Sequence, residues 1–379
     1  MYIPRKQIAN IQRLLQPGKV LVIYGARRVG KTTLLRKFLE TGQWNRNNLL
    51  MVYGDDIASR EYLESQSIQK LRDFVGNHSL LVIDEAQYIK NVGLNLKLLI
   101  DHIPDLCILV TGSSSFDLAN DIGEPLTGRK YVLRLYPVAQ LELAHKEKVH
   151  ETRANLESRL IYGSYPEVIM MRDNKLREQY LRELVRDYLF KDILELEGIR
   201  HSNKLLRLLQ LLAFQIGKEV SLNELGTHLS MSKNTVDKYL DLLEKVFVIY
   251  RRTGFSRNPR KEITKNHRYY FYDTGVRNAC IQNFNPIQLR NDKGMLWENY
   301  VLTERLKRNE YLNHHASFYF WRTYDRNEID LVEEAGEKLK GYEIKWQKGK
   351  GKAPKKWQVY YPNAEYSVIH TENYMQFIS

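Results

Sequence analysis

The chain has 379 residues, and its 58 Lys and Arg against 45 Asp and Glu give a formal net charge of +13. This length exceeds what one small core needs and predicts two or three domains. No apolar run approaches the length of a membrane span and no leader pattern opens the chain, so we expect no membrane segment.

The positive charge, with a pI near 9.4, favours a polyanionic partner. We expect that partner to be DNA, and a generically basic protein is the alternative. The two cysteines, Cys107 and Cys280, lie far apart and match no metal-binding spacing. Their use fits a reducing, cytoplasmic location.

A phosphate-binding loop is predicted near the start of the chain. Residues 25–33 match G-x-x-x-x-G-K-[ST], between a β-like run at 20–24 and apolar residues with helical spacing. The two glycines let backbone N–H groups turn inward around a polyphosphate, and a chance glycine-rich turn is the alternative. The predicted ATP-binding residues are Gly25, Gly30, Lys31, Thr32 and Thr33. Lys31 is expected to reach the β- and γ-phosphates, and Thr32 to offer its hydroxyl to Mg²⁺.

An acidic pair follows the apolar run Leu80–Ile83. Such a run predicts a strand buried on both faces, and a parallel sheet binds its ligands at the carboxyl ends of its strands. Asp84 is expected to hold Mg²⁺ through water, and Glu85 to polarise the water that attacks the γ-phosphate. The pair alone is a weak signal, but together with the loop it predicts ATP hydrolysis.

The first domain is predicted to be an α/β domain with a parallel sheet covered on both sides. The expected strands are 20–24, 49–53, 80–84, 106–110 and 131–135, and they alternate with helices such as 68–75 and 94–102. After the fourth strand, the polar run 111–115 places Ser113 where it can sense the γ-phosphate, unless it is only a serine-rich capping loop. Arg129 is a candidate for transition-state charge, from its own or a neighbouring subunit, or else a solvated arginine.

These motifs carry a family resemblance. Up to about residue 145 the chain resembles the AAA+-like P-loop ATPases often called archaeal-type ATPases, through residues 25–33, 80–87, 111–115, 127–129 and 135–138. Residues 162–167 and 180–184 continue the likeness. The resemblance implies a C-terminal region of restriction-endonuclease-like type after the ATPase, and so it covers nearly the whole chain.

A helical region and then a DNA-binding motif are predicted next. From about residue 140 to 198 the pattern is helical, and we interpret it as a lid over the nucleotide or, as the alternative, a spacer. From residue 202, an apolar helix, a helix capped by Ser221 and a helix from Ser232 form a helix-turn-helix signature, with wing strands at 246–252 and 268–272. Lys233, Asn234, Thr235 and Lys238 are expected to face DNA, while Val236, Leu240 and Leu243 pack inward. A domain used only for packing between subunits is the alternative.

A second set of chemical groups lies near the C-terminus. Residues 328–332 and 342–346 are predicted to form a hairpin joined by the turn at 334–337, and Glu298 lies in a helical pattern before it. Glu298, Asp330, Glu343 and Lys345 resemble the PD-(D/E)XK nuclease core, in which Asp330 and Glu343 would bind Mg²⁺ and Lys345 would orient water. The sequence departs from the PD-(D/E)XK pattern at two positions. Ile329 occupies the position of the proline, and the bulky Trp346 follows the lysine. An exposed hairpin is the alternative.

The predicted domains are a P-loop ATPase at 1–140, a helical lid at 141–200, a winged helix at 201–273 and a nuclease-like α/β domain at 274–379. The predicted function is ATP hydrolysis coupled to DNA engagement and to Mg²⁺-dependent phosphodiester cleavage, with a homo-oligomer as one possible assembly. The alternative is an ATP-driven regulatory switch that binds DNA or a protein and has no nuclease activity.

Overall fold

The computed structural model describes residues 2–41, 44, 46–113, 125–197, 202–257, 267–323, 327–349 and 351–379, the side chains of residues 46, 187–197 and 202 excepted. Ser114 and Ser115 of the predicted sensing loop lie outside the described residues. The described chain divides into two compact units. One comprises residues 2–137 with 245–247, and the other comprises 138–244 with 248–379.

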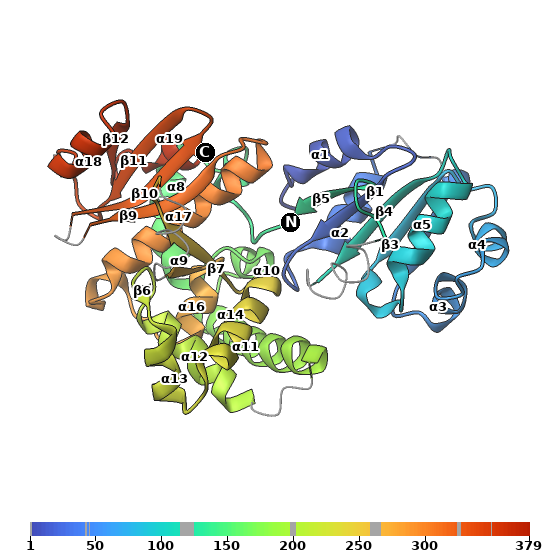
Figure 1. Ribbon diagram of the computed structural model, residues 1–379, viewed down its shortest axis with the longest axis horizontal. Helices are drawn as coiled ribbons and strands as arrows, with labels where there is room; N and C mark the ends of the chain where they lie inside the picture. Colours follow the sequence, from blue (N-terminus) through green and yellow to red (C-terminus); the bar gives the residue numbers. More distant parts are fainter. Residues whose placement is uncertain are drawn as a thin grey trace. The chain divides into compact units, whose positions relative to one another are not determined.

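The first unit is built on a five-stranded sheet in the order β2-β3-β4-β1-β5, and every pairing in it is parallel (Figure 1). The strands are β1 (Val20–Tyr24), β2 (Leu49–Tyr53), β3 (Leu80–Asp84), β4 (Cys107–Gly112) and β5 (Lys130–Arg134). All residues of β1, β3 and β4 are buried, because their apolar runs supply both faces of a covered sheet. The predicted α/β fold with a parallel sheet is confirmed, and the bounds of β1, β2 and β3 match the prediction.

In the described part of this unit, one helix precedes β1, and the others follow β1, β2 and β3. These helices are α1 (Gln7–Leu14), α2 (Lys31–Leu39), α3 (Ile57–Leu63), α4 (Ile68–Val75) and α5 (Val92–His102), with short 3-10 turns at Arg46–Asn48 and Ala86–Tyr88. Since parallel strands all end at the same edge of the sheet, the residues that follow β1, β3 and β4 are brought together there.

The second unit contains most of the helices and a mixed sheet in the order β12-β11-β10-β9-β7-β8-β6. Its strands are β6 (Glu219–Val220), β7 (Ile249–Gly254), β8 (His267–Phe271), β9 (Ser317–Arg322), β10 (Glu328–Ala335), β11 (Lys338–Ile344) and β12 (Glu365–Ile369). Its helices are α7 (Gln140–Leu143), α8 (Val149–Ala154), α9 (Leu156–Tyr162), α10 (Pro166–Met170), α11 (Asn174–Glu197), α12 (Ser202–Phe214), α13 (Leu222–Leu229), α14 (Lys233–Lys245), α16 (Thr274–Cys280), α17 (Lys293–Tyr311), α18 (Lys355–Tyr360) and α19 (Tyr374–Ile378), with a 3-10 turn at Ile287–Leu289.

The predicted winged-helix and nuclease-like regions share this one sheet. Strand β7 pairs antiparallel with β8 and parallel with β9, through Thr253 with Tyr319 and Gly254 with Phe320. The helices predicted as a lid also belong to this unit, where α9 and α11 pack against α16. Their role over a nucleotide therefore stays a prediction.

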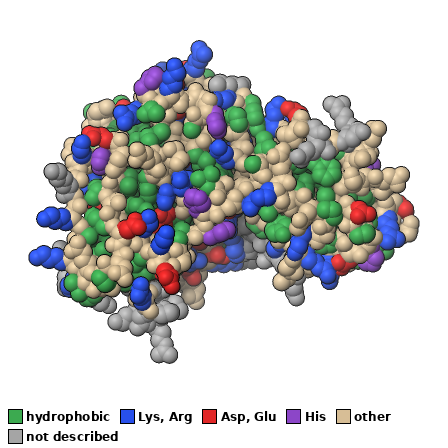
Figure 2. All heavy atoms as spheres, turned by 90° about the horizontal axis from the view of Figure 1, so that it is seen from above, with side chains coloured by type: hydrophobic (Ala, Val, Ile, Leu, Met, Phe, Trp, Pro, Cys, Tyr) green, Lys and Arg blue, Asp and Glu red, His purple; other side chains and the backbone are tan. Residues whose placement is uncertain are grey.

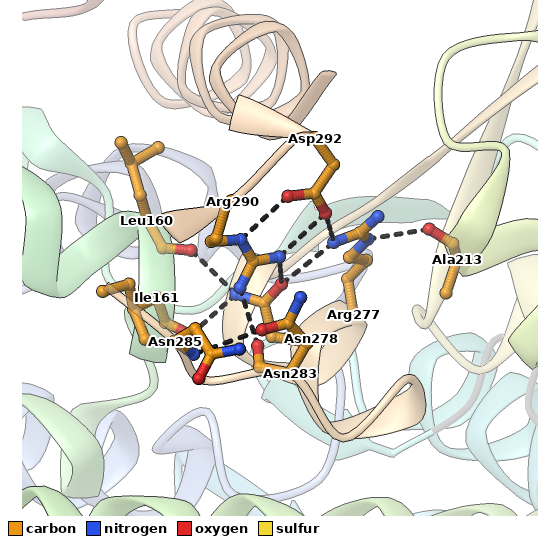
Figure 3. A network of polar contacts seen from close by, with 9 residues as sticks. All are labelled: Leu160, Ile161, Ala213, Arg277, Asn278, Asn283, Asn285, Arg290 and Asp292. Carbon is orange, nitrogen blue, oxygen red and sulfur yellow. Dashed lines mark hydrogen bonds and ion pairs between the residues drawn. The ribbon is translucent and has the colours of Figure 1, made fainter. Parts of the chain in front are cut away.

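A buried polar network fixes the start of α17 (Figure 3). The Arg277 guanidinium of α16 donates to the Ala213 carbonyl of α12 and to the Asp292 carboxylate, which immediately precedes α17. Arg290 donates to both oxygens of the same carboxylate, at 2.8 Å each. Asn278 donates to the carbonyls of Leu160 and Ile161 at the end of α9. The network thus ties three helices to the segment that leads into α17.

Within the described residues, none of the helices combines the length and the apolar character that crossing a membrane requires.

Candidate functional site

The predicted phosphate loop connects β1 to α2 at the carboxyl edge of the first sheet. Gly30 has φ of +95°, a left-handed conformation that strains residues with a side chain. A Cβ atom on Gly25 would lie 2.2 Å from the Leu135 carbonyl oxygen, so the backbone at this point leaves no space for one. Lys31 opens α2, is 4% exposed, and its Nζ donates to the carbonyls of Gly25 at 3.0 Å and Ala26 at 3.2 Å. The ammonium is therefore held over the loop.

The buried Asp84 carboxylate joins the loop to two neighbouring strands. Thr32 Oγ1 donates to Asp84 Oδ2 at 2.6 Å, and Thr111 Oγ1, from the end of β4, donates to Asp84 Oδ1. The two residues that were each expected to hold Mg²⁺, Thr32 and Asp84, are therefore in direct hydrogen-bond contact. A hydroxyl and a carboxylate oxygen at this separation are the ligands that Mg²⁺ prefers.

Glu85 is held beside this pair by contacts on three sides. Its backbone N–H donates to Thr111 Oγ1 at 3.1 Å, and its carboxylate accepts from Gln87 Nε2 at 2.5 Å. Lys31 Nζ lies 4.0 Å from Glu85 Oε1. Gln87 also donates to Ser113 Oγ at 3.0 Å, which places the predicted sensing serine in the same cluster.

Glu85 also has φ of +56°, a conformation uncommon for a residue with a side chain. Such backbone strain persists only where the surroundings over-determine it, which is characteristic of functional positions.

Arg129 lies at the opposite edge of the sheet from the loop. Its carbonyl accepts from the Val20 N–H at the start of β1, whereas the loop follows the end of that strand. Five residues at roughly 3.3 Å each put about 16 Å between the two positions, beyond the reach of an arginine. The side chain forms an ion pair with Asp101. A role for Arg129 within its own subunit is therefore wrong, and only the role in a neighbouring subunit stays a prediction.

Three residues of this site were not predicted from the sequence as parts of it. Gln87 and Thr111 belong to the motifs that follow β3 and β4, so their positions carried a usable signal. Arg5 did not, because its partners are distant in the chain: its guanidinium donates to the carbonyls of Val29 at 2.7 Å and Tyr136 at 2.6 Å. It braces the loop against the segment after β5.

The second candidate site lies in the second unit, where Glu298 of α17 and Glu343 of β11 act on the Asp330 carboxylate of β10. Burial, together with the charge of Glu328, raises the pKa of Glu298 to about 7, against the effect of the Tyr270 hydroxyl, which donates to Glu298 Oε1 at 2.7 Å. Burial and the charges of Glu298 and Glu343 raise the pKa of Asp330 well above its ordinary value. Glu298 and Glu343 therefore both lie within electrostatic reach of Asp330.

The predicted hairpin is present with different bounds: β10 extends to Ala335, β11 covers Lys338–Ile344, and residues 345 and 346 lie past its end. Ile344 is buried, its N–H donates to Asp330 Oδ2 at 2.7 Å, and Lys345 Nζ lies 3.4 Å from Glu343 Oε1. Lys345, the residue after β11, therefore lies on the same side as Glu343.

The sequence did not predict that strand β8 would also contribute to this site. Besides the Tyr270 bond, Arg268 binds Glu328 Oε1 at 2.5 Å, and a Cβ on Gly217 would lie 3.2 Å from Glu298 Oε1. The sheet pairing that brings β8 here joins segments far apart in the chain.

The donor chemistry of the second site fits a hard divalent cation, because Asp330 and Glu343 repel each other and offer only oxygen ligands. In the part of the chain that the structure describes, no group of three or more His, Cys, Asp or Glu side chains is close enough to hold one ion jointly. The geometry therefore leaves Asp330 and Glu343 as the candidate pair, with Glu298 as their neighbour.

Helix α14 presents the predicted polar face. Lys233, Asn234 and Lys238 are exposed, and Ser232 Oγ accepts from the Thr235 N–H at 3.1 Å at the start of the helix. Val236, Leu240 and Leu243 are buried, which confirms that they pack inward.

Uncharacterized proteins from several organisms are similar to most of this chain. An uncharacterized protein of Mycobacterium tuberculosis is 27% identical over 346 residues, spanning 90% of this chain and 73% of its own. Others, from Haemophilus influenzae and Methanocaldococcus jannaschii, are 26% and 23% identical, spanning 72% and 85% of this chain and 72% and 74% of their own.

Solved structures match only distantly. The replication initiator DnaA bound to AMPPCP and single-stranded DNA aligns with a TM-score of 0.32 and 14% identity, covering 64% of this chain and 90% of its own. Protein VC1899 from Vibrio cholerae aligns with a TM-score of 0.17 and 12% identity, covering 93% and 88%. Superpositions this poor carry no weight for function.

Family models divide the chain into three parts. Residues 153–287 match a domain of unknown function (DUF8612), and residues 293–377 match another (DUF4143). Residues 17–144 match an AAA domain, and that range contains the loop, Asp84, Glu85 and Ser113. The match and the loop geometry agree that the first unit is a P-loop ATPase domain.

Proposed function

We propose that the protein hydrolyses ATP with Mg²⁺ in its first unit and uses the cycle to engage DNA, which its second unit cleaves. One observation carries the ATPase part: Thr32, Asp84, Thr111 and Glu85 form a continuous chain of hydrogen bonds beside the buried Lys31. This arrangement holds a metal-binding pair and a water-positioning carboxylate at the same edge of the sheet.

Each side chain of the site has a separate role in ATP hydrolysis. The Lys31 ammonium and the N-terminus of α2 bind the phosphate oxygens, and Thr32 with Asp84 holds the ion. Mg²⁺ bound there would neutralise charge on the phosphates. Glu85 orients and polarises the attacking water, while Gln87 keeps its carboxylate in place. Ser113 lies within hydrogen-bond reach of Gln87 and so can report on the γ-phosphate.

ATP turnover separates these roles. Glu85→Gln should lower kcat about 100-fold or more and leave ATP affinity intact, because it removes only the water-polarising group. Lys31→Ala should instead weaken ATP binding. Glu64→Gln, on a carboxylate that within the described residues accepts only from the Lys90 N–H, is the matched control and should behave as the wild type. Wild-type turnover in Glu85→Gln would show that the assignment of Glu85 is incorrect.

The second activity, phosphodiester cleavage, is supported by the coupled carboxylates and the adjacent lysine. Asp330 and Glu343 would hold Mg²⁺, which lowers the pKa of a bound water and polarises the phosphodiester. Lys345 would orient the water or stabilise the developing charge. Glu298, held by Tyr270, is the nearby carboxylate that can accept a proton from that water.

Calorimetry and cleavage assays test this second site together. Asp330→Ala and Glu343→Ala should each abolish Mg²⁺-dependent DNA cutting, since each removes a metal ligand. Lys345→Ala should reduce cutting and retain metal binding, whereas Lys338→Ala, at the other end of β11, should change neither. If the wild type cuts no DNA form with Mg²⁺ or Mn²⁺, with or without ATP, and binds no metal here, the regulatory switch becomes the better account.

A further inference from the structure

One strongly basic stretch begins at Lys345 of the second site, and the rest of it takes no part in the sites described so far. Residues 345–356 contain six lysines and no acidic residue. The lysine segment is defined here as the described residues 345–349 and 351–356. Lys345 pairs with Glu343, and Lys348 with Glu372 at 3.0 Å. Lys352 and Lys355 are exposed, and within the described chain neither has an acidic partner.

Packing holds the lysine segment next to the carboxylates. It begins at Lys345, whose carbonyl accepts from Trp297 Nε1 at 2.9 Å. A Cβ on Gly351 would lie 2.8 Å from Val368 and 3.3 Å from the Tyr366 hydroxyl, so the segment runs closely along β12. In the parallel pairing of β11 with β12, Gly341 is opposite Tyr366 and Glu343 is opposite Val368, so the stretch of β12 that the segment follows lies next to the Glu343 strand.

Helix α18 continues the segment and presents an aromatic side chain. Trp357 is fully buried and anchors the helix in the cluster that contains Ile329. A Cβ on Gly341 would lie 3.3 Å from Trp357, and Gly341 faces the same side of β11 as Glu343. Tyr360, the last residue of α18, is 56% exposed. Exposed lysines and an exposed aromatic ring, which this short stretch of chain supplies together, are what single-strand binding surfaces combine.

We propose that the lysine segment and Tyr360 form a binding surface for single-stranded nucleic acid that leads to Asp330 and Glu343. Lys352 and Lys355 contact phosphates, and the Tyr360 ring stacks on a base. The inference rests on the proposed phosphodiester site, because it names the form of substrate delivered to it. Binding itself requires neither metal nor ATP.

Fluorescence anisotropy with full-length protein in EDTA tests the surface, using a labelled 20-nucleotide single strand and the corresponding duplex. The double variant Lys352→Gln/Lys355→Gln should reduce the salt slope for the single strand by about 1.4, at about 0.7 for each phosphate that is no longer neutralised. Tyr360→Ala should weaken single-strand binding about 5- to 150-fold, with no change in slope and little effect on the duplex, whose bases are already stacked. Lys175→Gln/Lys338→Gln and Phe214→Ala remove exposed lysines and an exposed ring elsewhere in the unit and serve as controls.

The controls should match the wild type. An unchanged slope in the lysine double variant, or an equal loss in its control, would overturn the proposal. So would a Tyr360→Ala defect that is the same on duplex and single strand. Because the assay contains no metal, these results stand whether or not the carboxylate site cuts DNA, and failure of cleavage alone leaves the binding surface intact.

Discussion

The Asp84 carboxylate divides its two oxygens between hydroxyls from different strands. Thr32 contacts one oxygen and Thr111 the other, so the carboxylate is oriented without a basic partner among these contacts. Thr111 also accepts from the Glu85 N–H. A hydroxyl that bonds both acidic residues fixes their relative positions, and the geometry of the hydrolytic water depends on that arrangement.

Gln87→Ala should lower the kcat for ATP hydrolysis about tenfold, with KM for ATP unchanged, because one hydrogen bond that orients Glu85 is removed. Gln69→Ala is the matched control, since Gln69 makes a similar bond to Asp73 on an exposed face at 3.0 Å. Steady-state kinetics of both variants provides the measurement. Equal kcat values for the two would remove Gln87 from the site.

At the scale of single residues, the residues of the motifs could be predicted from the sequence, but the residues that hold them in place could not. The spacing of Lys31 and Thr32 after Gly30, and of Asp84 at a strand end, is local, so sequence reasoning located each. Arg5 bonds to Tyr136, 131 positions away, and no local pattern signals such a contact. Arg129 is a residue type that suits a catalytic role, but the sequence does not indicate at which end of the strands it lies.

At the scale of elements, helix α17 owes its position to the buried Asp292. The hydrogen bonds from Arg290 and the charge of Arg277 outweigh burial and lower the pKa of Asp292 to about 2. Both arginines are almost fully buried, so the carboxylate is their compensating charge. Glu298 lies on the same helix, and its placement against Tyr270 follows from this anchor.

Asp292→Ala should destabilise the second unit by about 3–5 kcal/mol, because it leaves two buried guanidinium groups without their counter-charge. Urea unfolding followed by tryptophan fluorescence suits this test, since Trp297, Trp321, Trp346 and Trp357 all lie in this unit. Asp237→Ala on the exposed face of α14 should change stability by less than about 0.5 kcal/mol. Equal midpoints for both variants would contradict the role of the network.

The lowered pKa of Asp292 predicts that the free energy of unfolding depends on pH. Its pKa is about 2 in the folded chain against an ordinary value of 3.8, so its contribution is fully present above about pH 5 and is lost as the pH falls from 4 to 2. A shift of nearly two units corresponds to about 2.5 kcal/mol. Unfolding measured across this range should show the wild type losing more stability than Asp292→Asn. Parallel curves would exclude Asp292 as the titrating group.

The first and last residues of a strand could be predicted where its apolar run has polar residues on both sides. Strands β1, β2 and β3 stand between polar segments, and the predicted and observed limits agree. The joining of β7 to β9 was not predictable, because only two residue pairs connect strands more than sixty positions apart. For this reason Tyr270 and Arg268 were assigned to a different domain from the carboxylates that they contact.

At the scale of the whole molecule, the charge of +13 does not by itself locate a nucleic-acid surface. Lys and Arg side chains are scattered over the face drawn in Figure 2 instead of forming one patch. That the exposed lysines of α14 contact duplex DNA is therefore a separate hypothesis. It needs a test of its own, apart from the test of the single-strand surface.

Duplex affinity should fall steeply as salt rises, because neutralised phosphates release counterions. The double variant Lys233→Gln/Lys238→Gln should flatten the slope of log K against log salt by about 1.8, at about 0.9 for each phosphate. Lys175→Gln/Lys338→Gln should leave it unchanged. A slope unaltered by the α14 variant would indicate that this helix is a docking surface and not a DNA contact.

The two units are proposed to hold two separate hydrolytic sites. The most direct test measures ATP hydrolysis and DNA cleavage on one preparation of Asp330→Ala. We predict wild-type ATP turnover with no Mg²⁺-dependent cleavage, because the variant removes a ligand from the second site and leaves Asp84 and Glu85 untouched. Cleavage that persists in Asp330→Ala, or ATP turnover that disappears with it, would contradict the account.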